Sequence, residues 1–217
     1  MRARSKFATI ALALLLALSA SAQDARKILL VFGDSLSAGY GLQPGQSFPD
    51  RLQKRIDAEA LPWRVVNQGI SGDTTQGGLS RVKYALNQQP SVVVLELGGN
   101  DGLRGTPLAI TRKNLETLVT AFANGGARVV LAGMTLPPNF GSEYIRGFEA
   151  NYRDLATQYK LPFIPFLLSD IVTPDLRYLQ RDGIHPTAEG AEIVSGTVMR
   201  AIRPLLGAAA RSATAGH

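Results

Sequence analysis

The chain has 217 residues, of which 45% are hydrophobic and 18% are charged, and its formal net charge is +6. Because it contains no cysteine, disulfide bonds, thiolate nucleophiles and zinc sites built on cysteine are excluded. One internal histidine makes a histidine-rich metal site implausible, and no glycine-rich phosphate-binding motif follows the first predicted strand. We therefore expect neither a metal nor a cofactor.

The N-terminal segment has the pattern of an export signal. Three basic residues in positions 2–6 precede an apolar stretch over 7–18, and Ala20-Ser21-Ala22 has the form at which signal peptidase cleaves. A membrane anchor is the alternative, but a spanning helix needs about 20 apolar residues. We predict a signal peptide over 1–22, a periplasmic or secreted protein, and no integral membrane span after its removal.

Removal of this segment would leave 195 residues and lower the net charge to +3, because it takes away three basic residues and no acid. That charge gives nucleic-acid binding little support. A body of this size fits one domain, which we predict over 23–206, followed by a disordered tail over 207–217.

Short apolar runs alternate with amphipathic stretches along this body. The runs are rich in Val, Ile, Leu and Phe, which is typical of strands buried on both faces; they cover residues 28–32, 63–67, 92–97, 128–131 and 163–166. The amphipathic stretches predict helices over residues 49–60, 75–87, 107–124, 143–159 and 188–206. We expect Thr106 and Pro107 to start the third of these helices and Thr187 to cap the last.

Strand–helix alternation predicts an α/β fold with a parallel sheet covered by helices on both faces. Ligands of such sheets bind beyond the carboxyl ends of the strands. Ser35 follows the first predicted strand and Asn100 follows the third, so we expect both at the same edge.

Two segments at opposite ends of the body predict nucleophilic catalysis. Gly33-Asp34-Ser35-Leu36 follows the first strand, where the glycine lets the chain turn and present the serine hydroxyl. Asp182-Gly183-Ile184-His185 places a carboxylate three residues before the internal histidine. A carboxylate so placed can fix the histidine tautomer, and the imidazole can then deprotonate a serine. Alternatively, the serine is a loop residue and the histidine a surface residue.

Two further segments offer hydrogen-bond donors to an oxyanion. Gly72, in Ile70-Ser71-Gly72-Asp73, would let a backbone N–H approach a developing charge, and Gly69 is the alternative donor. Asn100, between Gly99 and Asp101-Gly102, can donate a side-chain N–H without adding charge. Each segment alone is also compatible with an ordinary turn.

In this order, the four segments resemble the four blocks of the SGNH (GDSL-type) hydrolases. The longer runs are most similar to the branch of periplasmic multifunctional acyl-CoA thioesterases, lysophospholipases and arylesterases. The resemblance implies a three-layer, flavodoxin-like α/β/α sandwich with a central five-stranded parallel sheet. It also implies Ser35 as nucleophile, His185 as general base, Asp182 as its partner, and an oxyanion hole made by Ser35, Gly72 and Asn100.

The predicted activity is hydrolysis of small-molecule or lipid acyl esters and thioesters by a monomer. For the acyl group we expect a site formed by residues near the same edge: Leu103, Arg104, Leu136, Phe140 and Ile184. A carbohydrate O-deacetylase would use the same catalytic residues. A flavodoxin-like binding module without hydrolysis is the alternative from another class.

Overall fold

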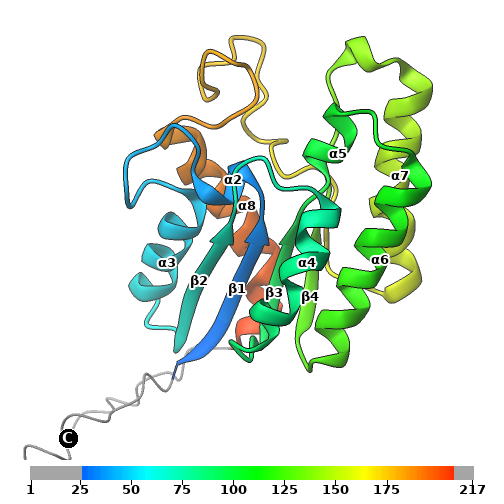
Figure 1. Cartoon of the computed structure of the whole chain (residues 1–217). Coiled ribbons are helices and arrows are strands. Elements are labelled where there is room, and N and C mark those ends of the chain that lie inside the picture. Colours follow the sequence, from blue (N-terminus) through cyan, green and yellow to red (C-terminus); the bar gives the residue numbers. More distant parts are fainter. Residues whose placement is uncertain (1–25, 208–217) are drawn as a thin grey trace, which may run out of the picture.

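The computed structural model describes residues 26–207, and its centre is a five-stranded sheet (Figure 1). All strand pairs are parallel, and the order across the sheet is β2-β1-β3-β4-β5. The strands are β1 (Lys27–Gly33), β2 (Trp63–Gly69), β3 (Val92–Glu96), β4 (Arg128–Ala132) and β5 (Phe163–Ile164). The predicted α/β fold with five parallel strands is confirmed. The proposed signal peptide, and the proposed tail beyond Gly207, lie outside the described residues.

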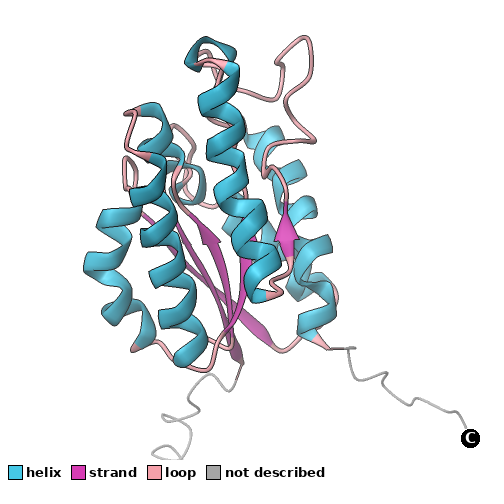
Figure 2. Ribbon diagram, turned by 90° about the vertical axis from the view of Figure 1, so that its right-hand side faces the viewer, coloured by secondary structure: helices cyan, strands magenta, loops and turns pink. Residues whose placement is uncertain are grey.

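Helices cover both faces of this sheet and form the outer layers of a sandwich (Figure 2). On one face α3 packs against α8, and on the other α6 packs against both α4 and α7. The helices are α2 (Ser35–Ala38), α3 (Phe48–Ala58), α4 (Thr75–Leu86), α5 (Gly99–Leu103), α6 (Leu108–Asn124), α7 (Ser142–Tyr159) and α8 (Ala188–Leu206), with a 3₁₀ turn η1 at Pro138–Phe140. In residues 26–207 no helix is both long and apolar enough to cross a bilayer.

The central strands explain why the sequence shows continuous apolar runs. Leu29, Leu30, Val31 and Phe32 of β1 are fully buried, since β1 has strand neighbours on both sides and helices above and below. In the register of the sheet, Gly33 lies beside Gly69 of β2 and Glu96 of β3. The loops that leave these three strands therefore begin at one edge of the sheet.

The structure corrects some predicted boundaries. Pro107 is the N-cap of α6 rather than its first helical residue, because its ψ of 129° is extended, and Thr106 does not cap the helix. Strand β5 ends at Ile164, since the following Pro165 has no N–H to continue the ladder. The prediction for the last helix is confirmed: the Thr187 side chain accepts a hydrogen bond from the Gly190 N–H. The short helices α2 and α5 were not predicted.

Candidate active site

The proposed nucleophile lies in the first turn after β1. Asp34 is the N-cap of α2, and its side chain accepts a hydrogen bond from the Leu36 N–H. Gly39, with φ of +78°, ends α2 after a single turn. Ser35 is the first residue of this short helix, and its Oγ is 2.8 Å from Nε2 of His185.

His185 and Asp182 lie in the connection between β5 and α8, and the structure brings both to Ser35. The Asp182 Oδ2 atom is 2.7 Å from Nδ1 of His185, and Oδ1 accepts from the N–H groups of Ile184 and His185. Burial alone would raise the pKa of Asp182, but hydrogen bonds from the His185 backbone and ring and from Ile184 lower it below its usual value. Asp182 is thus a carboxylate where His185 needs an acceptor, and Nε2 is directed at Ser35.

Gly72 lies in a tight turn after β2, closed by a hydrogen bond from the Asp73 N–H to the Ile70 carbonyl. Its φ of +80° favours glycine at this position. Within residues 26–207 the backbone N–H groups of Ser35 and Gly72 have no acceptor. The Gly69 N–H, by contrast, donates to Oδ1 of Asn67. Because the Gly69 N–H already has an acceptor, Gly72 is favoured over Gly69 as the second backbone donor to an oxyanion.

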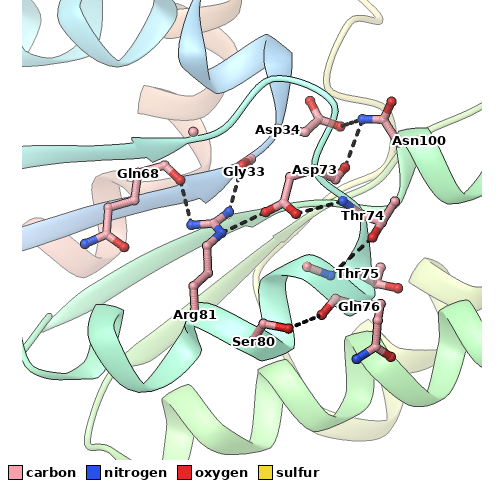
Figure 3. A network of polar contacts seen from close by, with 12 residues as sticks. Gly33, Asp34, Gln68, Asp73, Thr74, Thr75, Gln76, Ser80, Arg81 and Asn100 are labelled. Atoms are coloured by element: carbon pink, nitrogen blue, oxygen red, sulfur yellow. Dashed lines mark hydrogen bonds and ion pairs between the residues drawn. The ribbon is translucent and has the colours of Figure 1, made fainter.

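Asn100 lies in the first turn of α5, after Gly98, whose φ is +113°. Figure 3 shows its side-chain nitrogen between two acceptors: Nδ2 donates to the Asp73 carbonyl at 2.9 Å and to Oδ2 of Asp34 at 3.2 Å. Both contacts involve the nitrogen, so they fix which end of the amide faces the nucleophile turn. The geometry brings Asn100 together with Asp34, the residue before Ser35.

A buried acid lies beneath the nucleophile turn, and the sequence analysis did not single it out. Oε2 of Glu96 accepts from the N–H of Asp34, the N–H of Ser37 and the Ser37 hydroxyl. Burial raises the pKa of Glu96 well above its usual value, and the charge of Asp34 raises it further. A side chain on Gly33 would overlap Glu96 and Ser37, so the glycine is required for this packing. The sequence feature that could have indicated Glu96 is an acidic residue at the end of an otherwise apolar strand.

Ser35, Gly72, Asn100 and His185 line a cavity of about 600 Å³. Of the predicted acyl-binding residues, Leu103, Leu136 and Ile184 line it. Arg104 and Phe140 are not part of this wall. The Arg104 guanidinium donates to the Gly72 carbonyl instead, and Phe140 borders a separate hollow near the start of α7. Apolar lining residues that the sequence analysis missed are Leu36, Tyr40, Met134, Pro137, Pro138, Phe166, Leu168 and Val172.

Tyr40 illustrates why part of the wall was missed. Its ring centroid is 4.6 Å from that of His185, although the two residues are far apart in the sequence. The Tyr40 carbonyl accepts a hydrogen bond from Gln180, which belongs to the same connection as His185. Only the tertiary fold joins these segments, and no local pattern indicates it.

The chain is similar to known proteins in sequence and in fold. Residues 31–193 match the GDSL-like Lipase/Acylhydrolase family. Esterase TesA of Pseudomonas aeruginosa is 42% identical over 85% of this chain and 92% of its own length. Thioesterase 1/protease 1/lysophospholipase L1 of Escherichia coli is 36% identical over 88% of this chain and 89% of its own. A crystal structure of TesA, at 42% identity, has a TM-score of 0.79 and is matched over 100% of its length by 83% of this chain. The chain therefore belongs to the GDSL-like lipase/acylhydrolase family, and the predicted resemblance is confirmed.

Proposed function

We propose that this protein hydrolyses carboxylic esters and thioesters through a covalent acyl-enzyme on Ser35. Ser35 Oγ attacks the carbonyl carbon while Nε2 of His185 takes the hydroxyl proton. The tetrahedral intermediate collapses, and the leaving alcohol or thiol takes that proton from His185. Water then attacks the acyl-enzyme, gives one proton to His185 and releases the carboxylic acid, and the proton returns to Ser35.

In this proposal the oxyanion is held by the N–H groups of Ser35 and Gly72 and by Nδ2 of Asn100. The first two donors have no acceptor in residues 26–207, so they are available to a substrate oxygen. The Asn100 contact to Asp34 is the longer of its two, at 3.2 Å. We propose that this N–H is shared with the oxyanion in the transition state.

The wall of the cavity supports an acyl chain as the group that enters it. Leu136, Phe166, Leu168 and Met134 are apolar lining residues, and Ser35, Asn100 and His185 are among the polar ones. Such a site stabilises hydrocarbon by burial and fixes the reacting carbonyl with few hydrogen bonds. Long-chain acyl thioesters, lysophospholipids and aryl esters are therefore our proposed substrates, ahead of acetylated sugars.

The single observation that carries the proposal is the 2.8 Å contact between Ser35 Oγ and His185 Nε2, with Asp182 behind the imidazole. Labelling with a fluorophosphonate tests it, because the reagent phosphonylates only an activated hydroxyl. We expect one adduct, located on Ser35 by peptide mass spectrometry, and none in Ser35→Ala. Absence of labelling would instead support a binding module.

Substrate class is tested by measuring kcat/KM on four compounds under the same conditions: a long-chain acyl thioester, a lysophospholipid, a short-chain aryl ester and an acetylated xylo-oligosaccharide. We expect the first three to be hydrolysed and the sugar ester to be the poorest. Preference for the acetylated sugar would replace this proposal by O-deacetylation.

We also propose that the protein is exported, after cleavage between Ala22 and Gln23, and acts as a monomer. The basis for export is the sequence of residues 1–22, with its basic start, apolar stretch and Ala20-Ser21-Ala22. The basis for a monomer is the family resemblance. Expression of the full chain and sequencing of the mature N-terminus test the first part, and sedimentation velocity tests the second. A mature chain starting at Met1 would contradict export by this route.

A further inference from the structure

Arg81 of α4 connects the ends of β1 and β2 to Asp73, whose carbonyl accepts a hydrogen bond from Asn100 (Figure 3). Its Nη2 donates to the Gly33 carbonyl at 3.0 Å and its Nη1 to the Gln68 carbonyl at 2.8 Å. Its Nε donates to Oδ2 of Asp73 at 2.7 Å. One side chain thus contacts three separate backbone or side-chain groups beneath the catalytic cavity.

The surroundings of Arg81 favour a fixed geometry. Its side chain is 16% exposed and that of Asp73 is 10% exposed, so the ion pair is largely shielded from water. The guanidinium carbon lies 3.7 Å from the centroid of the Phe32 ring, which is fully buried. A planar guanidinium with donors in a rigid fork suits three acceptors at once, whereas a lysine ammonium on a flexible stem does not reproduce that fork.

Asp73 links Arg81 to the proposed oxyanion donors through hydrogen bonds. Its carboxylate accepts from Arg81 and from the Thr74 N–H, while its carbonyl accepts from Nδ2 of Asn100 at 2.9 Å. Its own N–H closes the turn that contains Gly72. The two proposed oxyanion donors outside α2 are therefore held through one residue whose side chain is paired with Arg81.

The hydrogen bond from Arg81 to the Gly33 carbonyl links Arg81 to the turn that carries Ser35. Gly33 is two residues before Ser35, and its carbonyl accepts from Arg81 and from the Ile70 N–H. Arg81 itself does not line the cavity. It can act on the reaction only through the groups it holds.

We propose that Arg81 is a positioning residue that fixes the oxyanion donors Gly72 and Asn100 relative to Ser35. This inference rests on the proposed function. A misplacement of reacting groups by about 1 Å can cost about a hundredfold in rate. We expect Arg81→Met to lower kcat by about tenfold to a hundredfold and to change KM by less than about threefold, because substrate does not touch Arg81.

Arg81→Lys and the double variant Arg81→Met/Asn100→Ala sharpen the test. The lysine keeps the charge but loses the fork, so we expect kcat between those of the wild type and Arg81→Met. In the Asn100→Ala background the amide that Arg81 helps to position is absent. The further loss of kcat caused by Arg81→Met should therefore be at least threefold smaller there than in the wild-type background.

Arg55→Met is the matched control. Arg55 of α3 binds Ser195 and Glu192 of α8, away from the cavity, through a similar set of guanidinium contacts. We expect this variant to lower the urea midpoint of unfolding and leave kcat unchanged. Circular dichroism and urea unfolding of every variant show whether each is folded during the assay.

Wild-type kcat in folded Arg81→Met would overturn the inference, and so would an equal loss of kcat in both backgrounds, which would indicate a structural role alone. If Arg81→Met does not fold, Arg81→Lys takes its place in the same cycle, with the same two overturning outcomes. Failure of the proposed function gives a different result, because it shows in the wild type itself: none of the four test compounds would be hydrolysed, or the acetylated sugar would be preferred.

Discussion

The nucleophile turn of residues 33–39 is held by buried groups from two other elements, whereas Asp182 and His185 are held by the exposed connection around them. Glu96 of β3 and Arg81 of α4 fix the backbone on either side of Ser35, and both are largely buried. Asp182, with a side chain 38% exposed, accepts from residues two and three positions later. The tertiary fold builds one half of the site, and a local turn builds the other.

The two halves should therefore respond differently to substitution. Substitutions around Ser35 disturb buried hydrogen bonds, so they should alter activity and stability together. Asp182 and His185 lie in a surface connection, and their side chains are 38% and 17% exposed. Substitutions there should change kcat by far more than they change the free energy of unfolding.

The largest expected effect is that of His185→Gln. Without an imidazole the Ser35 hydroxyl has no general base, and kcat should fall by about five to six orders of magnitude. The urea midpoint should stay close to that of the wild type. Steady-state kinetics with an aryl ester, with Ser35→Ala as the background rate, is the measurement. Turnover within tenfold of the wild type would show that another group takes the Ser35 proton.

Asp182→Asn should have the next largest effect. An amide at this position can still accept from the Ile184 N–H, but its NH₂ group would face Nδ1 of His185 and favour the wrong tautomer. We expect kcat to fall by about 10⁴-fold. Retention of more than a tenth of wild-type kcat would mean that the imidazole does not depend on this carboxylate.

Asn100→Ala should lower both kcat and the free energy of unfolding, because the Asn100 side chain lines the cavity and also bonds to Asp34 and Asp73. Loss of one oxyanion donor should lower kcat by about a hundredfold to a thousandfold. Loss of the contacts to Asp34 and Asp73 should also destabilise the fold by about 1 kcal/mol. Urea unfolding and kinetics on one preparation measure both effects.

Asn151→Ala is the matched control for that variant. Asn151 is buried, whereas Asn100 is partly buried; its Nδ2 also donates to a backbone carbonyl, that of Leu108, but it does not line the cavity. We expect a similar loss of stability with unchanged kcat. If the two variants lose kcat equally, Asn100 acts on activity through the fold and not through the oxyanion.

The contrast between the two halves also explains what could be predicted from the sequence. Buried strands such as β1 and β3 are continuous apolar runs, so the sheet and the edge that carries Ser35 and Asn100 followed from the pattern. Asp182 and His185 are three residues apart, and their contact needs only a local turn. Their contact with Ser35, 150 positions away, needed the family resemblance as well.

The supporting groups could not be predicted in the same way. Arg81 has the spacing of an ordinary helix residue, and nothing local indicates that its donors reach the ends of β1 and β2. Phe140 and Arg104 were expected in the acyl site because they are near its residues in sequence, yet neither lines the cavity: Arg104 contacts the Gly72 carbonyl and Phe140 borders a separate hollow. Glu96 looks like the last residue of an apolar strand, and its contacts come from residues about 60 positions earlier.

Among these variants, Glu96→Gln should have the smallest effect on kcat. The pH dependence of its free energy of unfolding should distinguish the two halves of the site. The folded pKa of Glu96 is raised, so its contribution to stability is full below the unfolded value of about 4.5 and is lost as pH rises towards the folded value. Glutamine does not titrate, so the free energy of unfolding of Glu96→Gln relative to the wild type should increase as pH rises from 5 to 8. The pKa of Asp182 is lowered instead, so its contribution is present at neutral pH and lost as pH falls. Asp182→Asn should therefore lose stability relative to the wild type as pH rises from strongly acid values. Urea unfolding of both variants at several pH values measures these changes in the free energy of unfolding. If the two variants changed in the same direction with pH, the pKa values of Glu96 and Asp182 would not be shifted in opposite directions.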